Sequence, residues 1–127
     1  MGKLLRVIAD QTVLADKVVN ADTYPLRKKG LLGRTTLALD EGALLCMPYQ
    51  TRLSLFFSIH MFGMPLSLAA AWIDRDGNIL QAKLAQPGRI YFPSGLFTDT
   101  GYILELHPAH LPTLQNASRI TWEEVDG

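Results

Sequence analysis

His60 is the residue whose type and setting most suggest chemistry in this sequence. It lies within residues 53–73, which contain no Asp, Glu, Lys or Arg. An imidazole in such a segment can line a ligand pocket, bind a metal or act as an acid or base. The plainer alternative is a buried histidine whose ring nitrogens are satisfied by backbone or hydroxyl groups. The residues around His60 must decide between these interpretations.

Nucleophilic catalysis finds little support near His60. Ser58 lies two residues earlier, and such side chains on a strand are about 7 Å apart, too far for a hydrogen bond. The segment Pro93-Ser94-Gly95 lacks the first glycine of a nucleophile elbow. We therefore assign no catalytic residue. An enzyme, either a hydrolase or a metal-dependent catalyst using His60 with Glu105 or His107, is the alternative hypothesis.

A metal site would have to be assembled from distant parts of the chain. His107 and His110 are spaced so that a helix would bring both rings to one side, but Pro108 disfavours helical geometry at His107. Neither a cysteine cluster nor an H-E-x-x-H motif supplies further ligands. A site built from His60, His107 and His110 stays open as an alternative. We predict no bound metal and no cofactor.

Glu105 is the acidic residue most relevant to a site. In the alternating segment 102–106 it points away from the face that carries Leu104 and Leu106. A solvated or ion-paired carboxylate is the default interpretation. The alternative is a pocket acid close to His60, if the two segments are neighbours in the fold.

The most basic stretch is RKKGLLGR at residues 27–34. Its glycines could approach a phosphate backbone, but Leu31 and Leu32 suit packing and no aromatic set accompanies them. A solvated helix end is the favoured interpretation. The chain has twelve basic and twelve acidic residues, so it has no overall field that attracts nucleic acid or anionic lipid. We predict no nucleic-acid partner.

Length and composition indicate a soluble chain with one domain spanning residues 1–127. About half of the residues (48%) are hydrophobic, which suffices for a core. Residues 53–73 are long enough to cross a bilayer, but Gly63 and Pro65 interrupt them, so we predict no membrane span. The single cysteine, Cys46, is interpreted as a small buried hydrophobe. The N-terminus lacks a signal-peptide pattern, and we expect a cytoplasmic location.

Alternation with period two dominates the chain and predicts a mainly β fold, a small barrel or sandwich with one or two short peripheral helices. The Asp76-Gly77 dipeptide predicts a hairpin turn. Thr23 is a candidate helix cap. The expected strands cover residues 4–8, 12–19, 43–47, 53–62, 66–73, 79–84, 102–106 and 119–123, and the expected helices cover 24–32 and 108–115.

Three collinear stretches together resemble a known family. They are RKKGLLGR at 27–34, SIHMFGMPLSLAAAWIDRDG at 58–77 and YILEL at 102–106. In this order and spacing they are similar to the bacterial and archaeal domain of unknown function 192. The resemblance covers residues 21–122 and implies a small β-rich fold with a short N-terminal helix. It implies no activity.

The sequence departs from that family where a polar pair would be expected. Threonine, arginine, proline and aspartate are usual at four positions that here carry Met61, Pro65, Ser67 and Ala69. The chain therefore lacks the arginine and aspartate that such a pair needs. His60 stands without those companions.

We therefore hypothesise a binding or interaction module with a shallow apolar pocket around His60. The partner would be a small molecule or a protein, and a homodimer formed through an exposed strand is a further possibility. The candidate pocket residues are His60, Phe62, Met64, Pro65, Trp72 and Glu105, with Tyr91 as a further aromatic wall.

Overall fold

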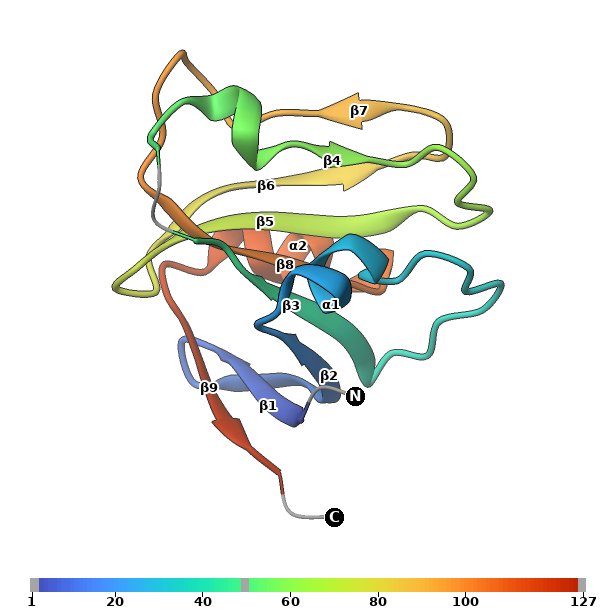
Figure 1. The fold of residues 1–127 in the computed structure, drawn as a ribbon. Coiled ribbons are helices and arrows are strands. Elements are labelled where there is room, and N and C mark those ends of the chain that lie inside the picture. The colour runs from blue at the N-terminus through green and yellow to red at the C-terminus, as the bar shows by residue number, and fades with distance from the viewer. Residues whose placement is uncertain (1–2, 49–50, 126–127) are drawn as a thin grey trace.

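The computed structural model describes residues 3–48 and 51–125 and is built mainly from β-strands (Figure 1). Seven strands form one sheet in the order β6-β5-β8-β3-β2-β1-β9, and a smaller sheet pairs β4 with β7. The strands are β1 (Leu4–Ala9), β2 (Thr12–Ala21), β3 (Glu41–Cys46), β4 (Ile59–His60), β5 (Leu68–Asp74), β6 (Ile79–Ala85), β7 (Ile90–Tyr91), β8 (Thr100–Leu106) and β9 (Ile120–Glu124). The helices are α1 (Tyr24–Lys29), α2 (Leu111–Asn116) and the 3₁₀ helices η1 (Ser54–Phe57) and η2 (Pro108–His110). The mainly β class is confirmed.

The central strands of the main sheet are buried on both faces. In β5 every residue from Leu68 to Ile73 is buried, and successive side chains alternate between two clusters. One cluster includes Ala69, Ala71, Leu104, Leu106 and Leu114 of α2, and we call it the α2-side core. The other includes Ala43, Met61, Met64, Ala70 and Trp72, and we call it the pocket-side core. Burial on both faces explains the nearly unbroken apolar sequence of β5.

The hairpin between β5 and β6 is confirmed at the predicted turn. The Asp74 carboxylate accepts hydrogen bonds from the backbone N–H groups of Asp76 (2.9 Å) and Asn78 (2.8 Å). Gly77 has a φ of +93°, which a residue with a side chain rarely adopts. These local interactions fix the turn, so it could be recognised from a few adjacent residues.

The barrel alternative is not confirmed, because the main sheet is open. Its edges are β6 and β9. Within the described residues these edges are joined by a single bridge between Asn78 and Arg119 rather than by a ladder. A sandwich-like arrangement fits better, since the small β4–β7 sheet lies over one face of β5 and β6 in Figure 1.

The expected strand over residues 53–62 is wrong for most of its length. Residues 54–57 form η1, and the strand β4 covers just Ile59 and His60, while Leu53 makes an isolated bridge to Phe97. A 3₁₀ helix repeats every three residues, so Ser54 and Phe57 are buried together while the side chains between them are exposed. Because apolar residues occur at both odd and even positions of this segment, the sequence does not show the change from the two-residue period of a strand to the three-residue period of a 3₁₀ helix.

The first helix is shorter than predicted. Thr23 caps α1 as expected, but the helix ends at Lys29 because Gly30 adopts a φ of +46° and donates its N–H to the carbonyl of Leu26. The predicted end at Leu32 is therefore wrong, and residues 30–34 form a loop. None of the helices in the described ranges has the length and apolar character that crossing a bilayer requires.

Candidate functional site

A pocket opens between the end of α1 and the segment around β4, over the pocket-side core. Its cavity volume is about 80 Å³. The polar and charged part of its lining comes from Arg27, Lys28, Lys29, Ser58, His60 and Glu105. The remaining lining comes from Gly30, Leu31, Leu32, Leu45, Ile59, Met61, Met64 and Leu68. Charged groups thus surround a largely apolar interior.

Glu105 is the buried acid of this pocket. Strand β8 places it between Ala43 of β3 and Ala70 of β5, whose small side chains leave the carboxyl room above the sheet. The residue is only 7% exposed, and its Oε1 atom has no hydrogen-bond partner within the described residues. Burial raises the pKa of Glu105 from 4.5 to about 7. The default interpretation of a solvated or paired carboxylate is wrong, whereas its predicted orientation away from Leu104 and Leu106 is confirmed.

Gly30 brings the end of α1 against the Glu105 carboxyl. A Cβ atom built at Gly30 would lie 2.9 Å from Glu105 Oε1. Its φ of +46° is also unfavourable for residues with a side chain. The absence of a side chain at this position therefore allows the basic helix end and the buried acid to share one pocket.

His60 lies on extended backbone in β4 and lines the pocket. It is exposed, so the interpretation as a buried, satisfied histidine is wrong. Its ring stacks on that of Phe62, with centroids 5.7 Å apart and an angle of 23° between the planes. Among the described residues no hydrogen bond joins His60, Ser58 and Glu105, so these side chains do not form a nucleophile–base arrangement.

The other predicted site residues divide between the pocket and its surroundings. Met64 is buried and lines the pocket, as does Glu105. Phe62 and Pro65 are exposed and lie outside the lining. Trp72 is fully buried in the pocket-side core, where its Nε1 donates to the carbonyl of Phe57 at 2.8 Å.

Tyr91 also lies outside the pocket lining. Its hydroxyl accepts a hydrogen bond from the backbone N–H of Gln86 at 2.9 Å. The aromatic walls proposed from the sequence, Trp72 and Tyr91, are therefore packing residues. Large rings next to a proposed pocket are needed to fill the core under the small sheet, and the sequence does not distinguish that use from ligand contact.

His107 and His110 have structural partners away from the pocket. His107 Nδ1 accepts from the Ala109 N–H at 3.0 Å and so caps η2, while His110 Nε2 lies 2.6 Å from the Leu39 carbonyl. Within residues 3–48 and 51–125 no group of three or more His, Cys, Asp or Glu side chains is arranged to hold a metal ion. The three-histidine alternative therefore has no support in the structure.

Cys46 is half-buried rather than fully buried. Its Sγ donates to Asn20 Oδ1 at 3.2 Å, and burial raises the pKa of the thiol. The interpretation as a buried hydrophobe is only partly right, because the residue also contributes a polar contact between β3 and β2.

The basic end of α1 is the part of the site that sequence reasoning missed. The prediction of a solvated helix end is confirmed for the exposed Lys28 and Lys29, but together with Arg27 they also line the pocket, which the sequence does not indicate. Arg27 Nη1 also donates to the Cys46 carbonyl at 3.2 Å. The available signal was Gly30, directly after a run of basic residues, since a glycine at a helix end also permits close approach of another element.

Comparison with known proteins identifies the family. The model of the family described as DUF192, uncharacterized ACR, matches residues 6–116. The UPF0127 protein of Thermococcus sibiricus is 32% identical over 114 residues, which cover 87% of this chain and 69% of that protein.

Two solved structures share the fold. One is a protein of Sinorhizobium meliloti described as a candidate transcription regulator, with a TM-score of 0.71, 25% identity and coverage of 96% of this chain and 92% of the other. The second is a protein of unknown function from Novosphingobium aromaticivorans, with a TM-score of 0.71, 18% identity and coverage of 94% and 83%. The resemblance inferred from three short stretches is confirmed, and the chain belongs to the DUF192 family.

Proposed function

We propose that this protein is a small-ligand binding module and that the pocket between α1, β4 and β8 is its binding site. The observation that carries the proposal is Glu105 Oε1, a buried carboxyl oxygen without a partner among the described residues, on a residue that lines a cavity of about 80 Å³. Leaving a buried polar group unsatisfied costs about 1–3 kcal/mol, and more for a charged group. A ligand that donates a hydrogen bond to this oxygen offsets that cost, which gives the arrangement a use.

Binding is favoured over catalysis by the arrangement of the polar groups. Glu105 and His60 share the pocket, as the enzyme alternative requires, but His107 lies elsewhere. No hydrogen bond connects the polar side chains of the pocket among the described residues. Acid–base or nucleophilic catalysis needs such connections to orient the reacting groups.

Nucleic-acid binding is also less favoured. The Sinorhizobium protein's description would suggest it, but this chain has equal numbers of acidic and basic residues. Its basic cluster borders a pocket that contains a buried acid. Phosphate backbones require extended positive surfaces.

A fragment screen followed by NMR tests the proposal. We expect small polar fragments to raise the melting temperature of the wild type and to shift the amide resonances of Gly30, His60 and Glu105. His60→Ala is expected to weaken binding without unfolding the protein, whereas Lys3→Ala, which removes an exposed lysine paired with Glu124, serves as a control without effect. If no fragment perturbs these resonances, the pocket is not a binding site.

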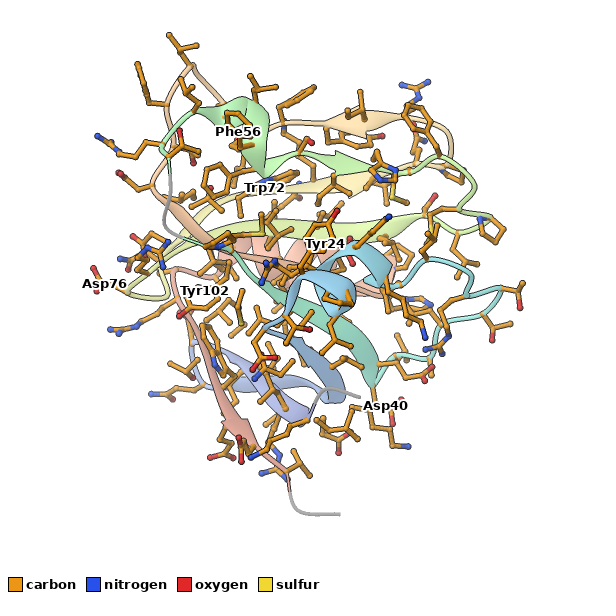
Figure 2. The ribbon with its side chains drawn as sticks, in the orientation of Figure 1. Tyr24, Asp40, Phe56, Trp72, Asp76 and Tyr102 are labelled. Atoms are coloured by element: carbon orange, nitrogen blue, oxygen red, sulfur yellow. The ribbon has the colours of Figure 1, made fainter. Side chains whose placement is uncertain are left out.

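Self-association is a second candidate, carried by a different surface. The side chains of Leu55, Phe56, Leu96 and Phe97 are each more than half exposed. Their segments are adjacent, since the Ser54 N–H donates to the Leu96 carbonyl at 2.9 Å (η1 and the loop beside it in Figure 1; Phe56 is labelled in Figure 2). The neighbouring charges of Arg52 and Asp99 pair with each other, so two copies could meet without like-charge repulsion.

Sedimentation at several protein concentrations tests this second candidate. We expect a monomer–dimer equilibrium that Phe56→Ser together with Phe97→Ser shifts to monomer. A wild-type monomer at every concentration would reject it.

A cytoplasmic location is likewise proposed on the basis of the free Cys46 thiol, which a reducing compartment preserves.

A further inference from the structure

The charges of the pocket are distributed unequally between its entrance and its interior. Lys28 and Lys29 are exposed at the end of α1 and form no ion pair within residues 3–48 and 51–125. Arg27 contributes a further positive charge, since its contact with the Cys46 carbonyl does not neutralise it. Glu105 is the single acidic residue of the lining. A ligand's anionic group is therefore attracted to the α1 side of the pocket.

The buried part of the pocket requires a hydrogen-bond donor rather than an anionic group. Glu105 Oε1 lacks a partner, and the Gly30 position lies against it. An anionic group placed there would face the carboxyl without a hydrogen between them once the carboxyl is ionised. A hydroxyl or an ammonium group instead donates a hydrogen bond to this oxygen. The required group is thus a donor.

Apolar side chains separate these two polar regions, and the space between them is short. The pocket walls include Leu31, Ile59, Met61 and Met64. A cavity of about 80 Å³ is several times the roughly 10–15 Å³ that one water-sized group needs, so the site has room for a small organic molecule. A chain of a few methylene groups fits between the two polar ends.

We propose that the ligand of this site is a small aliphatic organic anion with a hydrogen-bond donor at its other end. Its anionic group lies at the Lys28 and Lys29 side, and its donor reaches Glu105 Oε1. Short hydroxy acids and amino acids have this chemistry. The inference rests on the proposed binding function and specifies the ligand class for the same pocket.

A matched set of four-carbon compounds tests each requirement separately. The probes are γ-hydroxybutyrate and γ-aminobutyrate, which carry both groups; butyrate, which lacks the donor; and butanol and butylamine, which lack the anion. NMR titration of the wild type gives the affinity of each compound. We expect at least one of the bifunctional probes to bind about tenfold more tightly than all three others, as one hydrogen bond and one charge contact allow.

Two variants assign the two ends of the ligand. Lys28→Ala together with Lys29→Ala is expected to abolish the preference for γ-hydroxybutyrate over butanol. Glu105→Gln is expected to reduce the preference of the protein for both bifunctional probes over butyrate. The reduction should be larger for γ-aminobutyrate than for γ-hydroxybutyrate, because the amide keeps an acceptor but loses the charge that attracts an ammonium group.

The outcomes separate this inference from the proposed function. The inference is overturned if butyrate or butanol binds as tightly as both bifunctional probes. The pocket would then still be a binding site. Failure of all five probes overturns it as well. If, in addition, no screened fragment perturbs Gly30, His60 or Glu105, the binding function itself fails.

Discussion

The two faces of the main sheet are formed by the same strands but are covered differently. On the α2-side core, β8 contributes Leu104 and Leu106, both fully buried, and α2 packs Leu114 against this face. On the other face, β8 contributes Ile103 and Glu105, and the elements above leave a cavity of about 80 Å³. One strand thus supplies a sealed core and a polar pocket through alternate residues.

The alanines of β5 sharpen this contrast. Ala69 and Ala71 face the α2-side core, where larger neighbouring side chains occupy the space that they leave. Ala70 faces the pocket side of the sheet, where it is the register partner of Glu105 on the neighbouring strand β8. Small residues on a central strand therefore permit tight packing on one face and an opening on the other. The elements that cover each face of the strand determine whether that face is tightly packed or open.

The largest expected difference between the two faces concerns cavity formation. Leu104→Ala should lower the free energy of unfolding by about 2–5 kcal/mol, because the sealed core cannot fill the space. Met64→Ala removes the same number of side-chain heavy atoms from the pocket wall and should cost only about 1 kcal/mol, since it enlarges a space that water already reaches. Urea denaturation measures both. Equal losses would show that the pocket face is as sealed as the other.

The buried carboxyl gives the pocket face a pH dependence that the α2-side core lacks. The pKa of Glu105 is about 7 in the folded protein and near 4.5 when unfolded. Its full contribution to stability is present below about pH 4.5, where both states are protonated, and is lost as the pH rises through 7. The loss amounts to about 3 kcal/mol.

The variant Glu105→Gln isolates this effect. Its stability should vary less between about pH 5 and pH 8 than that of the wild type, and the gap between the two should widen in its favour as the pH rises. Glu41 and Asp74, whose pKa values are lowered, act at lower pH and in both proteins alike. Parallel pH profiles of the two proteins would contradict the burial of an uncompensated carboxyl. Chemical denaturation across the pH series provides the measurement.

A smaller effect concerns the approach of α1 to Glu105. Gly30→Ala places a Cβ atom 2.9 Å from Oε1, whereas Gly33→Ala, also at positive φ, meets nothing within 4 Å. We expect Gly30→Ala to cost about 1 kcal/mol more than this control. The excess should diminish when Glu105 is also changed to Ala, which a double-mutant cycle of unfolding free energies measures. An undiminished excess would assign the cost to the backbone alone.

The smallest effect is expected at His60. Its exposed ring makes a stacking contact with Phe62 and no hydrogen bond within the described residues, so His60→Ala should change stability by less than about 0.5 kcal/mol. His110→Ala removes a contact with the Leu39 carbonyl and should cost about 1 kcal/mol. Thermal denaturation compares the two. A larger loss at His60 would indicate a structural residue.

Elements specified by neighbouring residues could be predicted from the sequence. The β5–β6 hairpin follows from an Asx turn with Gly77, and the β1–β2 pair from local alternation. Helix η1 could not be predicted in this way, because Leu55 and Phe56 are as apolar as strand residues although both are exposed. Whether the sheet closes was also out of reach, since among the described residues β6 and β9 are linked by a single bridge between Asn78 and Arg119, next to the ends of the two strands.

For a related reason, some residues of the site could be predicted from the sequence, but the burial of Glu105 could not. His60 and Met64 stand in an unusual segment, and the alternation of residues 102–106 placed Glu105 away from Leu104 and Leu106. Its burial depends on Ala43, Ala70 and Gly30, which are distant in the sequence and meet only through strand pairing and the end of α1. Non-local pairing of that kind leaves no periodic signal.

The buried, unpartnered state of Glu105 is tested most directly by following its side-chain carboxyl carbon by NMR as the pH is varied. With selective ¹³C labelling, and with Glu105→Gln to assign the signal, we expect a transition at a pKa of about 7. A transition near the ordinary value of 4.5 would mean that the carboxyl is solvated or paired, and the pocket would lose the feature on which its proposed function depends.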